Sequence, residues 1–173
     1  MKDVDTLISE INAAFAKGQT REGTLLADQA VKQYPLEAAV WILRGQLNQH
    51  NGHLLAARQD LEKAYGLQHD NPLIVKRLFI ILEQLNDYTA VRKLLDEAIE
   101  RLPHDDDLFL TAAELDTILG DFQAAKAMTL RVLKDSPDHA GAIYNLAILG
   151  EGELAGGLDK VEALMEKTSS SSA

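Results

Sequence analysis

The sequence predicts an all-α fold, an α-solenoid of about ten helices arranged as helix–turn–helix repeats. Three observations lead to this prediction. Glycine or asparagine returns every 34 residues, proline falls near the end of most intervals, and the stretches between them carry apolar residues at helical spacing. An interval of this length is typical of stacked helical hairpins.

The turn within each repeat is predicted by position 15 of the interval. Counting repeats from Val4, Ala38, Pro72, Asp106 and Ala140, position 15 holds Gly or Asn in the first four repeats. These two residue types accept a left-handed backbone at low cost, and a helix commonly ends on such a residue. The residues concerned are Gly18, Gly52, Asn86 and Gly120.

Helices are predicted on both sides of this turn. Segment 72–85 has no helix-breaking residue after its first proline, and segment 88–102 spaces its apolar residues by three and four. Small residues recur at positions 8, 20 and 27, where they allow the two helices of a hairpin to approach closely. Each repeat therefore predicts two helices of roughly 12–15 residues.

Proline marks the connections between repeats. Position 32 is Pro35, Pro103 and Pro137 in three repeats, and proline ends one helix and favours the start of another. The missing proline reappears as Pro72 after Asn71, where we expect Asn71 to cap the next helix and Pro72 to occupy its first turn.

We expect a single array over residues 1–167, with a disordered tail over 168–173. The fifth repeat breaks the pattern, because its position 15 is Leu154 within the glycine-rich segment 150–157. A short helix is predicted at 158–167. This end fits an irregular fifth repeat or a polar cap equally well, since the last helices of a solenoid must face water.

The residues at these fixed positions resemble the tetratricopeptide repeat, whose signature runs Trp-x2-Leu-Gly-x2-Tyr, then Ala-x3-Phe, then Pro. The resemblance covers residues 4 to about 150 in phase, and it implies a right-handed solenoid. Arg44 and Asn48 depart from it, since the family has Leu and Tyr there. The matching residues are Trp41, Gly45, Ala57, Gly120, Phe122, Ala125 and Pro137.

Composition disfavours several classes of partner. The chain has 173 residues and a formal net charge of −10, which argues against nucleic acid and against an anionic membrane surface. With no cysteine it can form neither a disulfide nor a thiolate metal site. The first residues lack the apolar core of a signal peptide, so a cytoplasmic location is expected unless a signal was removed.

The sequence offers no constellation typical of an enzyme, a metal site or a cofactor site. His50 and His53 lie three apart, but no third ligand joins them, and they flank a predicted turn. The acidic run at 105–107 lacks the spacing of a calcium loop and suits the first turn of a helix. Segment 150–157 has the glycines of a phosphate loop without its Lys-Ser/Thr ending.

The resemblance implies a concave groove lined by the first helix of each repeat. Carried over by position, it names a set of candidate partner-binding residues. These are Ile8, Asn12, Phe15, Ile42, Gln46, Gln49, Lys76, Arg77, Ile80, Glu83, Thr111, Glu114, Tyr144 and Asn145.

Two features of this set bear on the partner. Its apolar members predict a contact strip, unless they pack against neighbouring repeats instead. Lys76 and Arg77 form a basic pair that could receive a carboxylate, or could offset Glu83 or Glu114. The carboxylate clamp by which some members of the family grip chaperone tails is matched at two of five positions, Asn12 and Arg77, which argues against that role.

The leading hypothesis is therefore a non-catalytic scaffold that binds a peptide or protein segment in its groove. One alternative is the docking or regulatory N-terminal region of a larger enzyme, since similar repeats precede sulfotransferase or glycosyltransferase domains in some bacterial proteins. Another alternative is a self-associating module, such as a homodimer formed through terminal helices.

Overall fold

The computed structural model describes residues 2–149, which form helices and contain no strand. The all-α prediction is confirmed. The predicted features at 150–157, 158–167 and 168–173 lie outside the described residues. The helices are α1 (Val4–Ala16), α2 (Thr20–Gln33), α3 (Ala38–His50), α4 (Leu54–Leu67), α5 (Pro72–Gln84), α6 (Tyr88–Arg101), α7 (Asp106–Ile118), α8 (Phe122–Asp135) and α9 (Ala140–Ile148).

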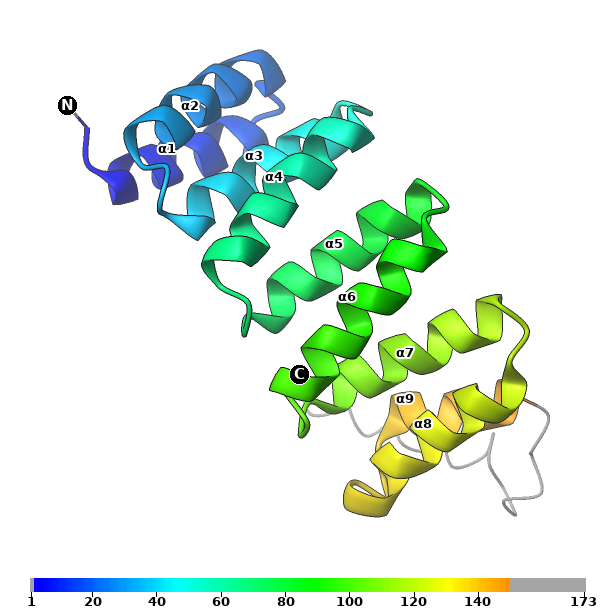
Figure 1. Cartoon of the computed structure of the whole chain (residues 1–173). Helices are drawn as coiled ribbons and strands as arrows, with labels where there is room; N and C mark the ends of the chain where they lie inside the picture. Colours follow the sequence, from blue (N-terminus) through cyan, green and yellow to red (C-terminus); the bar gives the residue numbers. More distant parts are fainter. Residues whose placement is uncertain (1, 150–173) are drawn as a thin grey trace, which may run out of the picture. The chain divides into compact units, whose positions relative to one another are not determined.

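The chain divides into two compact units, Met1–Arg101 and Leu102–Ala173, which are described separately. In the first unit, α1 packs on α2, α3 on α4 and α5 on α6, and each pair contacts the next (Figure 1). In the second unit, α8 packs on both α7 and α9. Each hairpin corresponds to one predicted repeat, whereas a single array over residues 1–167 stays a prediction.

The turn at position 15 has the left-handed backbone that the sequence predicts. Gly18, Gly52 and Gly120 have φ of 69°, 78° and 80°, and Asn86 is the one non-glycine residue of 2–149 with positive φ, at 57°. The residue after each turn donates its N–H back five positions, as Gln19 does to the Ala14 carbonyl at 2.9 Å. This bond closes the helix end and reverses the chain.

The connections between hairpins also follow the sequence. The Asn71 side chain accepts a hydrogen bond from the Leu73 N–H at 3.0 Å, and Pro72 is the first residue of α5. Asp105 caps α7 in the same way, through the Leu108 N–H at 3.2 Å, and Asp106 and Asp107 follow in the first turn. The acidic run at 105–107 therefore serves the start of a helix.

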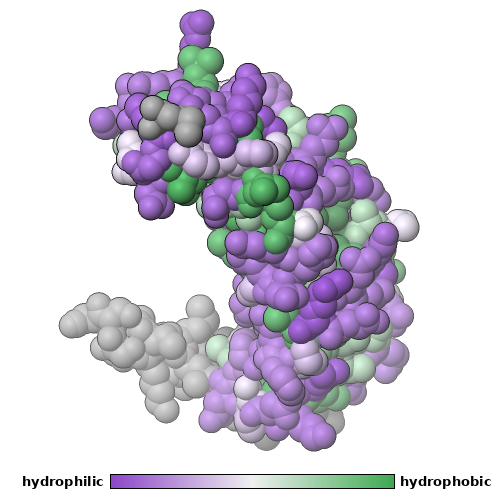
Figure 2. Space-filling model, turned by 60° about the vertical axis from the view of Figure 1, so that its left-hand side comes forward, coloured by the Kyte–Doolittle hydropathy of each residue, from purple (hydrophilic) through white to green (hydrophobic). Residues whose placement is uncertain are grey.

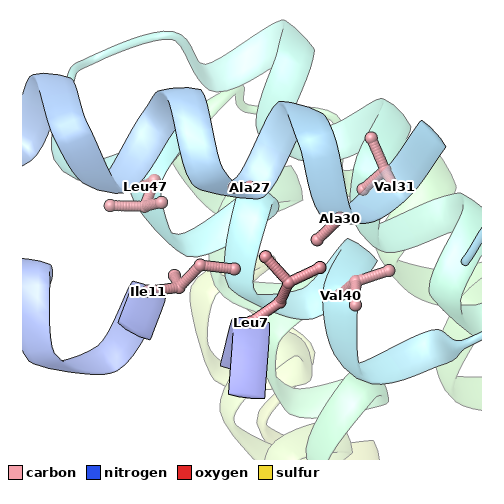
Figure 3. Packing of buried hydrophobic residues seen from close by; sticks show 7 residues of the cluster. All are labelled: Leu7, Ile11, Ala27, Ala30, Val31, Val40 and Leu47. Carbon is pink, nitrogen blue, oxygen red and sulfur yellow. The ribbon is translucent and has the colours of Figure 1, made fainter. Parts of the chain in front are cut away.

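The core of the first hairpins is a cluster of aliphatic side chains shared by three helices. Figure 3 shows Leu7 and Ile11 of α1 directed toward the small residues of α2 and toward α3. Close approach between α3 and α4 depends on Gly45, because a Cβ there would lie 3.1 Å from Leu61 Cγ. The cluster consists of Leu7, Ile11, Ala27, Ala30, Val31, Val40 and Leu47.

Arg44 and Asn48, which depart from the family signature in the second repeat, both donate hydrogen bonds to Asp60. Asp60 of α4 is 2% exposed, and it accepts hydrogen bonds from Arg44 Nε at 3.0 Å and from Asn48 Nδ2 at 2.8 Å. Arg44 Nη2 reaches the other carboxylate oxygen at 2.5 Å, and Nη1 reaches Asp28 of α2 at 3.2 Å. The hydrogen bond to Asp60 raises the pKa of Arg44, so this guanidinium joins three helices while charged.

Replacing Gly52 tests the left-handed turn. Gly52→Ala is expected to destabilise the protein by about 1–2 kcal/mol, because an alanine at φ 78° is strained even though no atom lies within 4 Å of its Cβ. Gly66→Ala is the matched control, since Gly66 lies in α4 with equally open surroundings and without a positive φ. It should stabilise by about 0.5 kcal/mol. Urea unfolding followed by circular dichroism measures both, and an equal effect of the two substitutions would contradict the assignment.

Removing Asp60 tests the buried network. Asp60→Ala leaves Arg44 and Asn48 without their shared acceptor, and should cost about 2–4 kcal/mol. Asp28→Ala removes a half-exposed partner of the same guanidinium, and should cost at most about 1 kcal/mol. The two free energies of unfolding, measured in urea, would contradict this account if Asp28→Ala cost as much as Asp60→Ala.

Candidate functional site

Ten of the candidate residues lie in the first compact unit, on α1, α3 and α5, which are the first helices of its three hairpins. Asn12, Phe15, Lys76 and Ile80 are exposed, and Phe15 and Ile80 keep 46% and 41% of their surface in contact with solvent. The other six are half-buried, namely Ile8, Ile42, Gln46, Gln49, Arg77 and Glu83. The side chains described below link these three helices in sequence.

Gln46 of α3 and Arg77 of α5 are brought together. With its oxygen directed toward Arg77, the Gln46 amide accepts hydrogen bonds from Nη1 and Nη2, each at 2.5 Å. The reversed amide would place its NH2 group against the guanidinium, so only this orientation satisfies both groups. One neutral oxygen therefore occupies the fork with which an arginine binds carboxylates.

A second contact joins the same two helices further along. Gln49 Nε2 donates to the Gln84 Oε1 at 3.3 Å. Gln46 and Gln49 are three residues apart on α3, and Arg77 and Gln84 are seven apart on α5, so both contacts lie on one face of each helix. We call these two contacts the α3–α5 rungs.

An aromatic contact joins α1 to α3. The rings of Phe15 and His50 meet edge to face, with centroids 5.3 Å apart. His50 is therefore placed against an aromatic ring, while His53 precedes the first residue of α4. Within residues 2–149 no group of three potential metal-binding side chains gathers around either histidine or elsewhere.

Two residues of this surface, His50 and Gln84, are absent from the candidate set. Both occupy position 13 of their repeats, which faces the groove in the tetratricopeptide family. The repeat register therefore contained the signal, although neither residue type is distinctive. We define the α1–α3–α5 face as Asn12, Phe15, Gln46, Gln49, His50, Lys76, Arg77, Ile80, Glu83 and Gln84.

The apolar candidates divide between this face and the core. Ile8 packs against the cluster around Leu7, and Ile42 against the cluster around Ile74, so both contribute to packing between helices. Phe15 and Ile80 remain exposed. Figure 2 shows that apolar residues on the viewed surface form separate patches among hydrophilic ones.

The candidates in the second compact unit have different surroundings. Thr111 of α7 is only 7% exposed, and its hydroxyl donates to the Asp107 carbonyl at 2.7 Å, so it offers little to a partner. Glu114 of α7 and Tyr144 of α9 are exposed, and Asn145 is half-buried. None of the helices within residues 2–149 has the length and apolar character that crossing a membrane requires.

No protein-family model matches the chain. Among curated proteins, the human crooked neck-like protein 1 is 35% identical over 92 residues, which are 53% of this chain and 11% of that protein. The chain spans between 10% and 14% of the curated relatives that it matches.

Solved structures resemble the chain over nearly its whole length. A double mutant of MamA from RS-1 has a TM-score of 0.75 at 13% identity, with 98% of this chain and 99% of that chain covered. YrrB, described as a TPR protein with an unusual peptide-binding site, has a TM-score of 0.67 at 19% identity, with 92% and 84% covered. Together with the 34-residue register, these likenesses show that the chain has the tetratricopeptide-repeat fold.

Proposed function

We propose that the protein is a non-catalytic scaffold that binds an extended protein segment on its α1–α3–α5 face. The observation that carries this proposal is the Gln46–Arg77 contact, which holds a guanidinium fork on a half-buried surface between two helices. Around it, amide side chains can bond to a peptide backbone, and Phe15 and Ile80 supply exposed apolar surface. A surface of this mixed kind suits a protein ligand.

The charge of the face favours an acidic group on the partner. Lys76 and Arg77 are adjacent cations in a chain with a net charge of −10, so a carboxylate meets a local attraction here. Arginine also presents paired N–H groups that match the two oxygens of a carboxylate. We therefore propose a segment with one acidic side chain directed at Arg77.

The rest of the segment is expected to be neutral. Glu83 lies on the same α5 helix, six residues beyond Arg77, and would repel a second carboxylate. The Gln49–Gln84 rung offers amide donors and acceptors at that end instead. A chain that passes through the site is favoured over one that ends there, since polar groups continue beyond the arginine.

The likeness to YrrB supports a peptide ligand at the level of analogy. YrrB has an unusual peptide-binding site, and its fold is similar to that of this chain. Fold likeness does not transfer a ligand, so the proposal depends on the residues of the α1–α3–α5 face.

Selection of peptides from a displayed random library tests this function. Peptides retained by the wild-type chain should share an acidic residue, and Lys76→Gln/Arg77→Gln should bind them at least about tenfold more weakly. Arg92→Gln/Lys93→Gln is the matched control, because it removes an adjacent basic pair from α6 of the same compact unit. Equal loss in both double variants, or selected peptides without acids, would contradict the proposal.

The same variants should remain folded. Lys76→Gln/Arg77→Gln removes the hydrogen bonds between the half-buried Arg77 and Gln46, and should lower the free energy of unfolding by no more than about 1.5 kcal/mol. The urea midpoint of the α6 control should shift by no more than that of the α5 variant. A large loss of stability in the α5 variant alone would show that the basic pair serves the fold.

A further inference from the structure

The Arg77 guanidinium already donates hydrogen bonds to a side chain of the same protein, Gln46. The Gln46 amide oxygen lies 2.5 Å from both of its terminal nitrogens, in the place that one oxygen of a bound carboxylate would take. The other α3–α5 rung differs in this respect, because Gln49 and Gln84 are both neutral amides. The difference between the rungs points to a role for Gln46 beyond packing.

We infer that Gln46 is an internal competitor for the carboxylate site, and that an acidic side chain displaces it from Arg77 when a segment binds. This inference rests on the proposed function and adds a residue that lowers its affinity. A neutral partner that enters between Nη1 and Nη2 of Arg77 would have to break the Gln46 contact and replace it with one of similar strength. A carboxylate gains a charge-assisted pair of hydrogen bonds, roughly twice as strong as neutral ones.

The exchange also explains how the face can discriminate. Because the Gln46 amide already satisfies the fork, neutral and weakly polar groups gain little by entering, and only a charged acceptor has a clear advantage. The displaced amide keeps a donor and an acceptor, which it can offer to the backbone of the bound segment. Gln46 thus lowers the affinity of every ligand that displaces it by the same factor, so that only a charged acceptor, with its stronger hydrogen bonds to Arg77, still binds appreciably.

Two substitutions of Gln46 change this competition in opposite directions. Gln46→Ala removes the competitor and should tighten binding of an acidic segment about threefold to tenfold. Gln46→Glu places a permanent carboxylate opposite Arg77 and should weaken binding at least about threefold. Gln49→Ala is the matched control, because it removes a glutamine from the same face of α3 whose partner is uncharged, and it should stay within about twofold of wild type.

The experiment uses a fluorescent hexapeptide, acetyl-Ala-Gln-Leu-Glu-Gln-Ala-amide, whose capped ends leave glutamate as its single carboxylate. A twin with glutamine in place of glutamate measures selectivity. Anisotropy titrations of both peptides against the full chain give the affinities of wild type, Gln46→Ala, Gln46→Glu and Gln49→Ala. The same four proteins are titrated in the Arg77→Gln background, where Gln46→Ala should change nothing.

The outcomes separate this inference from the proposed function. Tighter binding by Gln46→Ala, lost in the Arg77→Gln background, supports the competition. Unchanged or weaker binding by Gln46→Ala would show that Gln46 does not compete for Arg77. If wild type still prefers the glutamate peptide in that case, the proposal of an acidic partner is kept. If no protein distinguishes the glutamate peptide from its twin, both the acidic partner and the competition are wrong.

Discussion

The left-handed residue that ends the first helix of each hairpin is the constraint on which the rest of the structure depends. At Gly18, Gly52, Asn86 and Gly120 the backbone takes a positive φ, and the next N–H closes the helix end behind it. Because this reversal recurs every 34 residues, equivalent positions of successive hairpins fall on equivalent faces. The α1–α3–α5 face therefore follows from where three turns lie in the sequence.

Features that depend on one residue and its backbone were predictable from the sequence. Residue type and place predict the positive φ at position 15, the cap by Asn71 and the acids at the start of α7, and each is present. Such features need no knowledge of a distant partner, since Gly, Asn, Asp and Pro constrain their own neighbourhood. The fold class followed because these local constraints agree across repeats.

Features that depend on a choice between distant partners were not predictable. The sequence marks Arg44 and Asn48 only as departures from the family signature, and their shared acceptor Asp60 lies in the next helix. The sequence offers Glu83 and Glu114 as partners of the Lys76–Arg77 pair, whereas Arg77 in the structure contacts Gln46, 31 residues earlier. Position within a repeat limits which side chains can meet, but size, charge and rotamer decide which of them do.

The α3–α5 rungs have a consequence for how this protein can change during evolution. Each rung takes one residue from the second repeat and one from the third, so neither repeat carries the site by itself. Gaining or losing a whole repeat outside residues 38–101 would leave the pair of repeats intact, whereas inserting one between α4 and α5 would separate Gln46 from Arg77. The part that must be kept together during evolution is therefore the contact between the second and third repeats, where α3 meets α5.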